Sequence, residues 1–411
     1  MQKRVNSQFL KELNEVRILN LIKSEGLISR IELARRTRIS KVAVSEIVSR
    51  LTNAGFILEV GKGESTKKGG KKPFLIRINP DNGYVIGVEI RRKSATIALA
   101  NLDSQIVDSE MVSYPAGLSI DDALDSIFTK IDLLISRNDI KPEKLISIAI
   151  GVPGFIDYDK GQLIFADTIQ GWGSQPLAHR FADRFRVPVF IDNDVNMMAL
   201  GEFLLGSGKD ESNLVYIWIG EGIGAGIIVE GQLLRGRNGS AGEIGYLELG
   251  HLIADKAQFK MLYSDQKYVG EMFVEERLMN TLRKSLYLSS NDDSLVLESI
   301  GKDETELPAQ AVETLNEYAR LIAVVCSNLI KTLNTNMIIL SGKIIENSPY
   351  LLKRTKEFVA EIMGAIPFQP TKIVQGELRN TACIKGTIAM ALQVVFSQSI
   401  KDNALRGILP R

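Results

Sequence analysis

The chain is poor in cysteine and has no long uninterrupted apolar run. Its two cysteines, Cys326 and Cys383, lie far apart in apolar stretches, so their spacing offers neither a disulfide framework nor a metal site. No apolar segment reaches the roughly 20 residues that a membrane-spanning helix needs, and no signal-peptide pattern is found. We therefore expect a cytoplasmic protein whose two thiols stay reduced in the core.

A large excess of one charge is also missing from the whole chain, but the charges are unevenly distributed. The net charge is only +1 over 411 residues. Residues 1–80 hold 17 Lys and Arg against 7 Glu and no Asp, a net charge of +10, whereas the remainder holds 33 against 42, a net charge of −9. A basic segment joined to an acidic one indicates that the basic segment meets a polyanion. The length allows two or three domains.

The basic segment has the pattern of three short helices. A first helix is predicted over residues 14–25. A second begins at the capping box of Ser29 and Glu32, and a third begins at Ser40 after a turn of about three residues. The third helix has an apolar face that must be buried, formed by Val44, Ile47, Val48 and Leu51. Two short helices joined by a tight turn are typical of the helix-turn-helix, whose second helix lies in the major groove of DNA.

A wing is predicted after these helices. Residues 56–60 and 73–78 form predicted strands around a loop rich in glycine and lysine, whose cations can neutralise phosphates or line a minor groove. The predicted DNA contacts are small, polar or cationic: Ser40, Lys41, Ala43, Ser45, Ser49, Arg50, Lys71 and Lys72. The alternative is a three-helix bundle without a DNA function, in which the lysines only form a solvated surface.

Beyond residue 83 the chain alternates strand-like and helix-like segments, the pattern of an α/β protein. Residues 189–202 begin as an apolar strand and continue as a helix, with Asn193 and Asp194 at the junction. Ligands of open α/β sheets bind beyond the carboxyl ends of strands. The two side chains can therefore grip the hydroxyls of a polyhydroxylated molecule. The alternative is that they only cap the following helix.

Several glycine-rich turns follow predicted strand ends. The motifs are Gly151-Val152-Pro153-Gly154-x-x-Asp157, Gly171-Trp172, Asn193-Asp194-x-Asn196, Gly220-x-Gly222-Ile223-Gly224 and Ala241-Gly242-Glu243-Ile244-Gly245. In this order, behind a winged helix, they resemble the motifs of the ROK family of repressors, open reading frames and sugar kinases. The resemblance covers nearly the whole chain and points to the xylose-repressor-like branch of transcriptional regulators. It implies an N-terminal winged helix-turn-helix followed by a two-lobed α/β body of the actin/hexokinase-like (ribonuclease H-like) fold.

The resemblance also implies domain boundaries. The DNA-binding domain covers residues 1–80. A small lobe covers residues 84–200 and is completed by a C-terminal helix near residues 385–400, and a large lobe covers residues 201–384. The family places its sugar in the cleft between the two lobes.

Carried over residue by residue, the resemblance implies a set of sugar or effector ligands. They are Asn193, Asp194, Glu243, Tyr246, Glu271 and Gly154. Tyr246 stands where the family has a His that reaches the sugar, so the effector chemistry can differ. The alternative for Glu243 is a structural carboxylate beside a glycine-rich turn. The alternative for Glu271 is the solvated face of a helix that it shares with Glu275 and Glu276.

The nucleotide-binding features of the family's sugar kinases are altered here. Glu89 stands where the kinases have a metal-binding Asp, and Arg91, Arg92 and Lys93 fill the glycine-rich turn. Such side chains block the close backbone approach that a phosphate cradle needs. In the second phosphate loop Glu221 replaces a Thr and repels phosphate. We therefore expect no enzyme activity and no cofactor, although Asp194 matches the family's catalytic base.

The family's structural zinc is not expected either. Tyr246 occupies the position of a zinc-binding His, and residues 254–269 contain no cysteine. The histidines, His179 and His251, lack a partner set, whereas tetrahedral zinc needs about four ligands.

We therefore expect a sugar- or polyol-responsive repressor of carbohydrate-utilisation genes. It would bind a palindromic operator in double-stranded DNA as a homodimer, which can pair into a tetramer, and would be released by its effector. Two alternatives stay open: a sugar kinase with a DNA-binding head, and a DNA-binding protein that no effector controls. The effector, the operator, the regulated genes and the sign of the response are not determined by the sequence.

Overall fold

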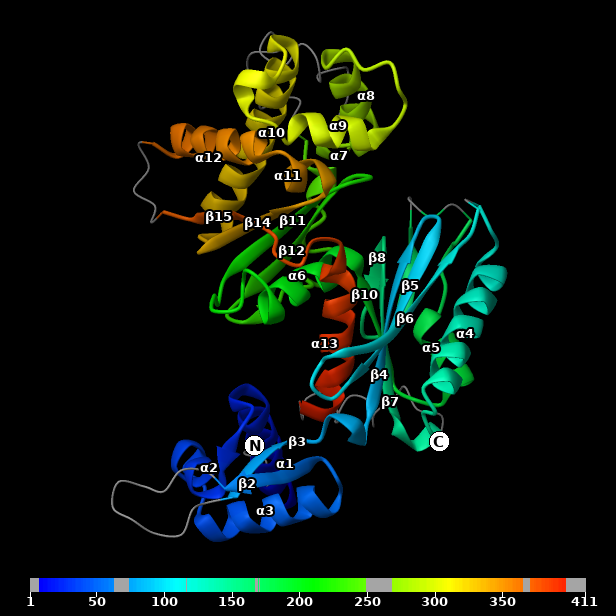
Figure 1. The fold of residues 1–411 in the computed structure, drawn as a ribbon, viewed down its shortest axis with the longest axis vertical. Helices are drawn as coiled ribbons and strands as arrows, with labels where there is room; N and C mark the ends of the chain where they lie inside the picture. The colour runs from blue at the N-terminus through cyan, green and yellow to red at the C-terminus, as the bar shows by residue number, and fades with distance from the viewer. Residues whose placement is uncertain are drawn as a thin grey trace. The chain divides into compact units, whose positions relative to one another are not determined.

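The computed structural model describes residues 7–62, 74–115, 117–166, 169, 171–248, 268–364 and 370–396 (Figure 1). Contacts within the chain group it into two units. The first unit contains residues 1–150, 175–191 and 387–411, and the second contains residues 151–174 and 192–386. The predicted domain boundaries divide the chain at other points and stay a prediction.

The N-terminal part of the first unit, the head, is a winged helix. Its elements are α1 (Ser7–Glu25), β1 (Ile28–Ser29), α2 (Arg30–Thr37), α3 (Lys41–Asn53), β2 (Ile57–Lys62) and β3 (Phe74–Ile78). The strands form an antiparallel sheet in the order β1-β3-β2. The hydroxyls of Ser29 and Ser40 accept hydrogen bonds from the backbone N–H groups of Glu32 and Ala43, which confirms both predicted helix starts.

The interior of the head follows the predicted pattern. The buried residues of α3 are those of its predicted apolar face: Val44, Ile47, Val48 and Leu51. The first helix, however, begins at Ser7 rather than at residue 14. Residues 8 and 10–13 are good helix formers, and Phe9 and Leu13 continue the apolar spacing that leads to Val16, so the predicted start was placed too late.

The rest of the first unit is built on a five-stranded sheet in the order β10-β7-β4-β5-β6. Its strands are β4 (Tyr84–Arg91), β5 (Ser94–Asn101), β6 (Ile106–Ser113), β7 (Leu145–Val152) and β10 (Val189–Asn193). Its helices are α4 (Ile120–Arg137), α5 (Leu177–Phe185) and α13 (Ala382–Phe396). Helix α13 packs on the sheet through Ser147 of β7, whose hydroxyl donates to the carbonyl of Ala391 at 2.8 Å. Strands β4 and β5 pair antiparallel over their whole length, from Tyr84 with Asn101 to Arg91 with Ser94.

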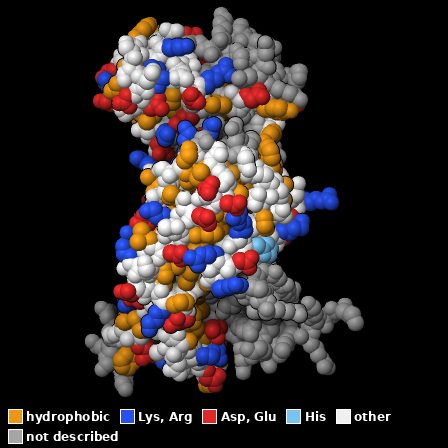
Figure 2. All heavy atoms as spheres, turned by 90° about the vertical axis from the view of Figure 1, so that its right-hand side faces the viewer, with side chains coloured by type: hydrophobic (Ala, Val, Ile, Leu, Met, Phe, Trp, Pro, Cys, Tyr) orange, Lys and Arg blue, Asp and Glu red, His pale blue; other side chains and the backbone are white. Residues whose placement is uncertain are grey.

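Strand β6 lies at an edge of this sheet and carries charge. Arg137 of α4 pairs with Asp108 at 2.7 Å and with Glu110 at 2.8 Å, and Lys130 also reaches Glu110. The face drawn in Figure 2 correspondingly shows cations and anions interspersed among its described side chains. Charged side chains along an edge strand disfavour its pairing with another chain.

The second unit is built on a five-stranded sheet in the order β13-β12-β11-β14-β15. The strands of this unit are β8 (Phe155–Asp157), β9 (Gln162–Phe165), β11 (Leu214–Ile219), β12 (Ile223–Val229), β13 (Gln232–Leu233), β14 (Met337–Ser341) and β15 (Lys372–Gln375). Its helices are α6 (Asp194–Leu205), α7 (Val269–Met272), α8 (Glu275–Ser285), α9 (Asp293–Ile300), α10 (Ala309–Leu333), α11 (Lys343–Asn347) and α12 (Pro349–Met363).

Helices cover both faces of this sheet (Figure 1). Along β11, Val215 and Ile217 belong to the apolar core that α10 and α12 complete. The side chain between them points the other way, because the Tyr216 hydroxyl lies 3.7 Å from the sulfur of Met198 on α6. Gly226 of β12 also faces α6, where a Cβ atom would lie 2.3 Å from the Cβ of Ala199. Small residues on β12 thus let α6 approach the sheet closely.

Three sequence-based expectations bear on this unit and on the chain as a whole. The motif Gly220-x-Gly222-Ile223-Gly224 was expected to form a turn after a strand, but β12 already begins at Ile223, because Gly224 and Gly226 lie where the strand packs against α6. Cys326 and Cys383 are both buried, and neither takes part in a disulfide, as predicted. Among the described residues, no helix combines the length and the apolar composition needed to span a membrane.

Candidate functional site

The predicted DNA contacts of the head lie on the first turns and the outer face of α3. These residues reach the surface fully or in part: Ser40, Lys41, Ala43, Ser45, Ser49 and Arg50. The guanidinium of Arg50 lies 2.8 Å from the carboxylate of Glu15 on α1, so its charge is partly balanced within the head. Lys71 and Lys72 lie outside the described residues. Contact of all these residues with DNA stays a prediction.

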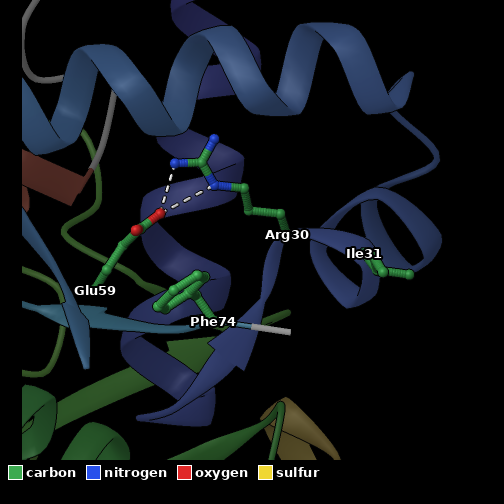
Figure 3. Close-up of a pocket in the computed structure, with 4 residues that line it drawn as sticks. All are labelled: Arg30, Ile31, Glu59 and Phe74. Atoms are coloured by element: carbon green, nitrogen blue, oxygen red, sulfur yellow. Dashed lines mark hydrogen bonds and ion pairs between the residues drawn. The ribbon is translucent and has the colours of Figure 1, made fainter. Parts of the chain in front are cut away.

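A pocket in the head lies apart from these residues. It is lined by Arg30, Ile31, Glu59 and Phe74. Figure 3 shows the Arg30 guanidinium meeting the Glu59 carboxylate, 2.6 Å away, with the Phe74 ring beside the pair. The opposite charges of Arg30 and Glu59 neutralise each other, and both side chains are partly exposed. The pocket contains none of the residues predicted to hold a sugar.

The predicted sugar residues all lie in the second unit, and the junction of β10 with α6 supplies two of them. The Asn193 side-chain oxygen accepts hydrogen bonds from the N–H groups of Val195 and Asn196, so Asn193 caps α6. Its side-chain nitrogen donates to the carbonyl of Gly154 at 3.1 Å. Asp194, half-buried, accepts from the N–H of Val195 at 3.0 Å. The capping alternative is therefore confirmed for Asn193, whose amide also holds a second motif.

Gly154 contributes through its backbone. Its φ angle is +118°, and a Cβ atom there would lie 2.2 Å from the carbonyl oxygen of Phe165 on β9. No other residue type fits this conformation without moving β9. The glycine thus keeps the Gly154 carbonyl beside Asn193 while the chain turns into β8.

A buried ion pair behind Asn193 was not found from the sequence. The Asp192 side chain is only 3% exposed and pairs with Arg235 at 2.6 Å. Its other oxygen accepts from the side chain of Asn196 at 2.9 Å and from the backbone N–H of Asn193. The Arg235 guanidinium also stacks on the ring of Tyr158, 3.9 Å from its centroid. In the sequence, Asp192 looked like an ordinary strand residue. Its one unusual feature was that it is a charged residue directly after the apolar run of a predicted buried strand.

Arg235 begins the loop that carries Glu243. Within it, Gly242 has a φ of +90°, and a Cβ there would lie 1.9 Å from the carbonyl of Ala225 on β12. The N–H of Ala225 donates to the Gly242 carbonyl at 2.9 Å. Glycine thus lets the loop lie directly against β12, with Glu243 half-buried at its end.

Tyr246 and Glu271 lie on two neighbouring short turns. Tyr246 ends the turn η3 (Ile244–Tyr246), its N–H donates to the Glu243 carbonyl, and its side chain is 47% exposed. Glu271 lies on α7, and its carboxylate accepts from the N–H of Tyr268 at 3.4 Å. The expectation that Glu271 shares a helix with Glu275 and Glu276 was wrong, because those residues begin the separate helix α8.

Contacts connect these segments into one continuous site. The ring of Phe155, next to Gly154, lies 5.8 Å from the ring of Tyr246, which lies 6.2 Å from that of Tyr268. Asn193, Gly154, Glu243, Tyr246 and Glu271 therefore belong to one connected group of turns. An amide can donate to and accept from hydroxyl groups, and carboxylates accept from them. Binding of a sugar by these residues stays a prediction.

The altered nucleotide turn lies in the first unit. Arg91 pairs with Ser94 across the β4–β5 hairpin, so Arg92 and Lys93 form a tight two-residue turn. Glu89 is buried, and the Arg91 guanidinium lies 2.6 Å from its carboxylate. Burial raises the pKa of Glu89 while Arg91 opposes that rise. The carboxylate that stands where the kinases have their metal-binding Asp is therefore paired with a cation of its own strand.

Metal binding is not indicated by the residues that the structure describes. No group of three or more His, Cys, Asp and Glu side chains there could hold an ion. Residues 254–267 of the family's zinc loop and His251 lie outside those residues, so the expected lack of zinc stays a prediction.

The Asp192–Arg235 pair makes a stability prediction. Arg235→Met should lower the free energy of unfolding by about 3–5 kcal/mol, because it leaves a buried carboxylate without its cation. Adding Asp192→Asn should restore part of the loss, since a neutral amide needs no counter-charge. Urea unfolding of the full chain measures both, with the exposed Arg237→Met as the matched control. An Arg235→Met protein as stable as the control would contradict this account.

Comparison with known proteins agrees with this geometry. The ROK family model matches residues 85–394, and a winged helix-turn-helix DNA-binding model matches residues 12–57. A xylose repressor of Caldicellulosiruptor bescii is 28% identical over 95% of this chain and 98% of its own length.

Two solved structures share the fold. A ROK family transcriptional regulator, a homologue of the E. coli MLC protein, is 22% identical, with a TM-score of 0.77 over 97% of this chain and 100% of that chain. A ROK family glucokinase from Streptomyces griseus, in complex with glucose and AMPPNP, is 21% identical, with a TM-score of 0.61 over 76% of this chain and 100% of its own. The predicted fold class, a winged helix-turn-helix before a two-lobed α/β body, is confirmed. The chain belongs to the ROK family and carries a winged helix-turn-helix DNA-binding domain in front of its ROK body.

Proposed function

We propose that this protein is a cytoplasmic, sugar- or polyol-responsive repressor of carbohydrate-utilisation genes. It binds a palindromic operator as a homodimer, and its effector releases it. The observation that carries this proposal is a DNA-binding head joined to a body in which the predicted sugar ligands lie on connected turns and Arg92 and Lys93 form a tight turn at the position of the kinases' phosphate loop. The similarity to a xylose repressor over almost the whole length supports the same function.

The effector is held through its hydroxyl groups. Asp194, Glu243 and Glu271 offer carboxylate oxygens that accept from hydroxyls, and Asn193 offers an amide beside the Gly154 carbonyl. A site built to pair hydroxyls discriminates against molecules that lack them, because its polar groups are then left unpaired.

The body regulates rather than catalyses. A sugar kinase needs an open glycine-rich turn for phosphate and a free carboxylate for the metal. Here Arg92 and Lys93 occupy the turn, and Glu89 is buried against Arg91. Both features oppose nucleotide binding, while leaving the sugar residues of the second unit unaffected.

A dimer follows from the demands of DNA recognition. One recognition helix reads only a few base pairs, so a single head offers limited specificity. Two heads related by a two-fold axis read two half-sites, and the operator then has the matching palindromic symmetry.

Helix α13 offers a route from the effector to the head. Near its start, a Cβ at Gly386 would lie 1.8 Å from the carbonyl of Met197, so α13 touches the backbone of α6 within the second unit. At its end, in the first unit, the carbonyl of Phe396 accepts from the side chain of Asn20 on α1 at 2.7 Å. Lys23 of α1 lies over the Phe396 ring at 4.2 Å. One helix therefore contacts both the helix that begins at Asp194 and the first helix of the head.

The effector must bind the DNA-incompetent arrangement more tightly than the competent one. DNA must by reciprocity weaken effector binding by the same factor. A coupling free energy of roughly 2–3 kcal/mol would give a fifty- to hundredfold release.

This proposal is tested with the full chain and an operator selected from random duplex DNA. Monosaccharides, disaccharides and polyols are screened for a rise in Tm and then for their effect on DNA affinity by fluorescence anisotropy. At least one compound should raise Tm and weaken DNA binding by about fifty- to hundredfold, the range expected for a typical coupling free energy. Sugar-dependent ATP turnover that Asp194→Asn abolishes would instead identify a kinase. DNA affinity that no compound changes would identify an effector-independent protein.

The role of α13 makes a separate prediction. Asn20→Ala removes a hydrogen bond worth about 1 kcal/mol, so effector-induced release should fall about fivefold while effector affinity in the absence of DNA stays unchanged. Ser24→Ala is the matched control, because its hydroxyl donates to the carbonyl of Leu21 within α1. If the effector releases DNA equally from the two variants, as measured by anisotropy, α13 does not couple the effector site to the head.

A further inference from the structure

A row of aromatic rings runs through the turns that carry the predicted sugar ligands. Phe155 lies on β8, Tyr246 at the end of η3 and Tyr268 immediately before α7. Adjacent ring centroids are 5.8 and 6.2 Å apart, and Phe165, opposite Phe155 on β9, extends the row at 6.3 Å.

Each of these segments pairs a ring with a hydroxyl-binding group. Phe155 follows Gly154, whose carbonyl is held by Asn193. Tyr246 lies on the turn that begins at Glu243. The N–H of Tyr268 binds the Glu271 carboxylate. The same short turns thus place polar and aromatic groups side by side.

The rings are incompletely buried, although each lies beside at least one other ring of the row. Tyr246 is 47% and Phe165 is 50% exposed, and Phe155 and Tyr268 are partly exposed. Neighbouring planes are tilted by 45° and 66°, so each ring offers a face or an edge of its own rather than one flat surface. Large aromatic side chains left open beside polar groups are typical of ligand sites.

We propose that this row is a stacking surface that selects a pyranose sugar over an open-chain polyol. A pyranose with equatorial hydroxyls has a flat face of C–H groups, which packs on an aromatic ring while the rim hydroxyls meet the carboxylates and amides. An open-chain polyol has no such face and gains only the hydroxyl contacts. The selection rests on the proposed function and narrows its effector to cyclic sugars.

The test compares matched probes on the full chain by calorimetry and thermal shift. The cyclic probes are methyl β-D-glucopyranoside, methyl β-D-xylopyranoside, N-acetylglucosamine and cellobiose, and the open-chain probes are sorbitol and xylitol. At least one cyclic probe should bind about tenfold more tightly than either polyol, a difference of about 1.4 kcal/mol. A polyol that binds as tightly overturns this selection and leaves the sugar response standing. If neither class of probe binds, both the selection of cyclic sugars and the proposed sugar response are overturned.

Variants separate stacking from hydrogen bonding. Tyr246→Ala should weaken binding of the cyclic probe about tenfold, whereas Tyr246→Phe should keep it, because the ring and not the hydroxyl makes the contact. Tyr287→Ala, at a tyrosine that is 74% exposed outside the row, should change nothing. If Tyr246→Phe loses as much affinity as Tyr246→Ala, the hydroxyl carries the effect and the stacking surface is wrong.

A second observation concerns the head and is independent of the effector. Val42, the second residue of α3, is 70% exposed, more than Leu27, Ile31 or Phe74 elsewhere in the head. A β-branched residue costs some helix stability and gains nothing from burial here. It lies at the N-terminal end of the predicted recognition helix, the part that reaches base edges in this class of domain.

We infer that Val42 reads the C5-methyl group of a thymine in the major groove. Apolar side chains distinguish thymine from the other bases through that methyl group, which is its only apolar feature in the groove. The neighbouring Ala43 and Ser45 are small, so they leave room for the valine to approach. This inference depends only on DNA binding by the head.

Replacement of dT by dU removes the methyl group and nothing else. In the selected operator, one symmetric pair of dT-to-dU changes should weaken binding about fourfold for each half-site, the value of one buried methyl-sized group. Val42→Ala should bind the dT operator more weakly and lose this dependence on dU, whereas Ile31→Ala should keep it. Equal binding of every dU operator, or an unchanged dU effect in Val42→Ala, would overturn the assignment.

Discussion

The candidate site depends on the pairing of one buried carboxylate. Asp192 ends the apolar part of β10 inside the protein, where an unpaired charge would be very costly. Arg235 supplies the counter-charge from a distant loop, and Asn196 supplies a hydrogen bond from α6. Because the loop that begins at Arg235 also carries Glu243, the pair that satisfies Asp192 ties two parts of the predicted sugar site together. Stability and site geometry therefore rest on the same contact.

The glycines that mark the chain as a ROK protein serve the fold before they serve any ligand. Gly154 and Gly242 allow backbone to approach backbone, and Gly226 lets α6 lie against the sheet. The same fold occurs in a ROK family transcriptional regulator and in a ROK family glucokinase, so the fold alone does not decide between the two functions. The two functions must differ elsewhere, and the hairpin closed by Arg92 and Lys93 is one such place.

The polar and apolar parts of the site have different physical tasks. In the proposed function, Asn193 and the carboxylates recognise hydroxyls and so favour any polyhydroxylated molecule. Aromatic rings such as Tyr246 add contacts that depend on the shape of the ligand, because a flat apolar face is needed to cover them. Helix α13 in turn touches α6 near Met197 within the second unit and α1 at Asn20 within the first.

Local patterns in the sequence were enough for the winged helix, since the hydroxyls of Ser29 and Ser40 and the apolar face of α3 act within a few residues of one another. They were also enough, with the family motifs, to select Asn193, Asp194 and Glu243. Only the tertiary structure paired Asp192 with Arg235, aligned Phe155, Tyr246 and Tyr268, and separated Glu271 from Glu275. These features join residues far apart in the chain. Neither the hydrophobic period of a segment nor the spacing within a motif indicates which distant charges or rings will come into contact. Long-range compensation of charge and packing of rings are decided when the chain folds.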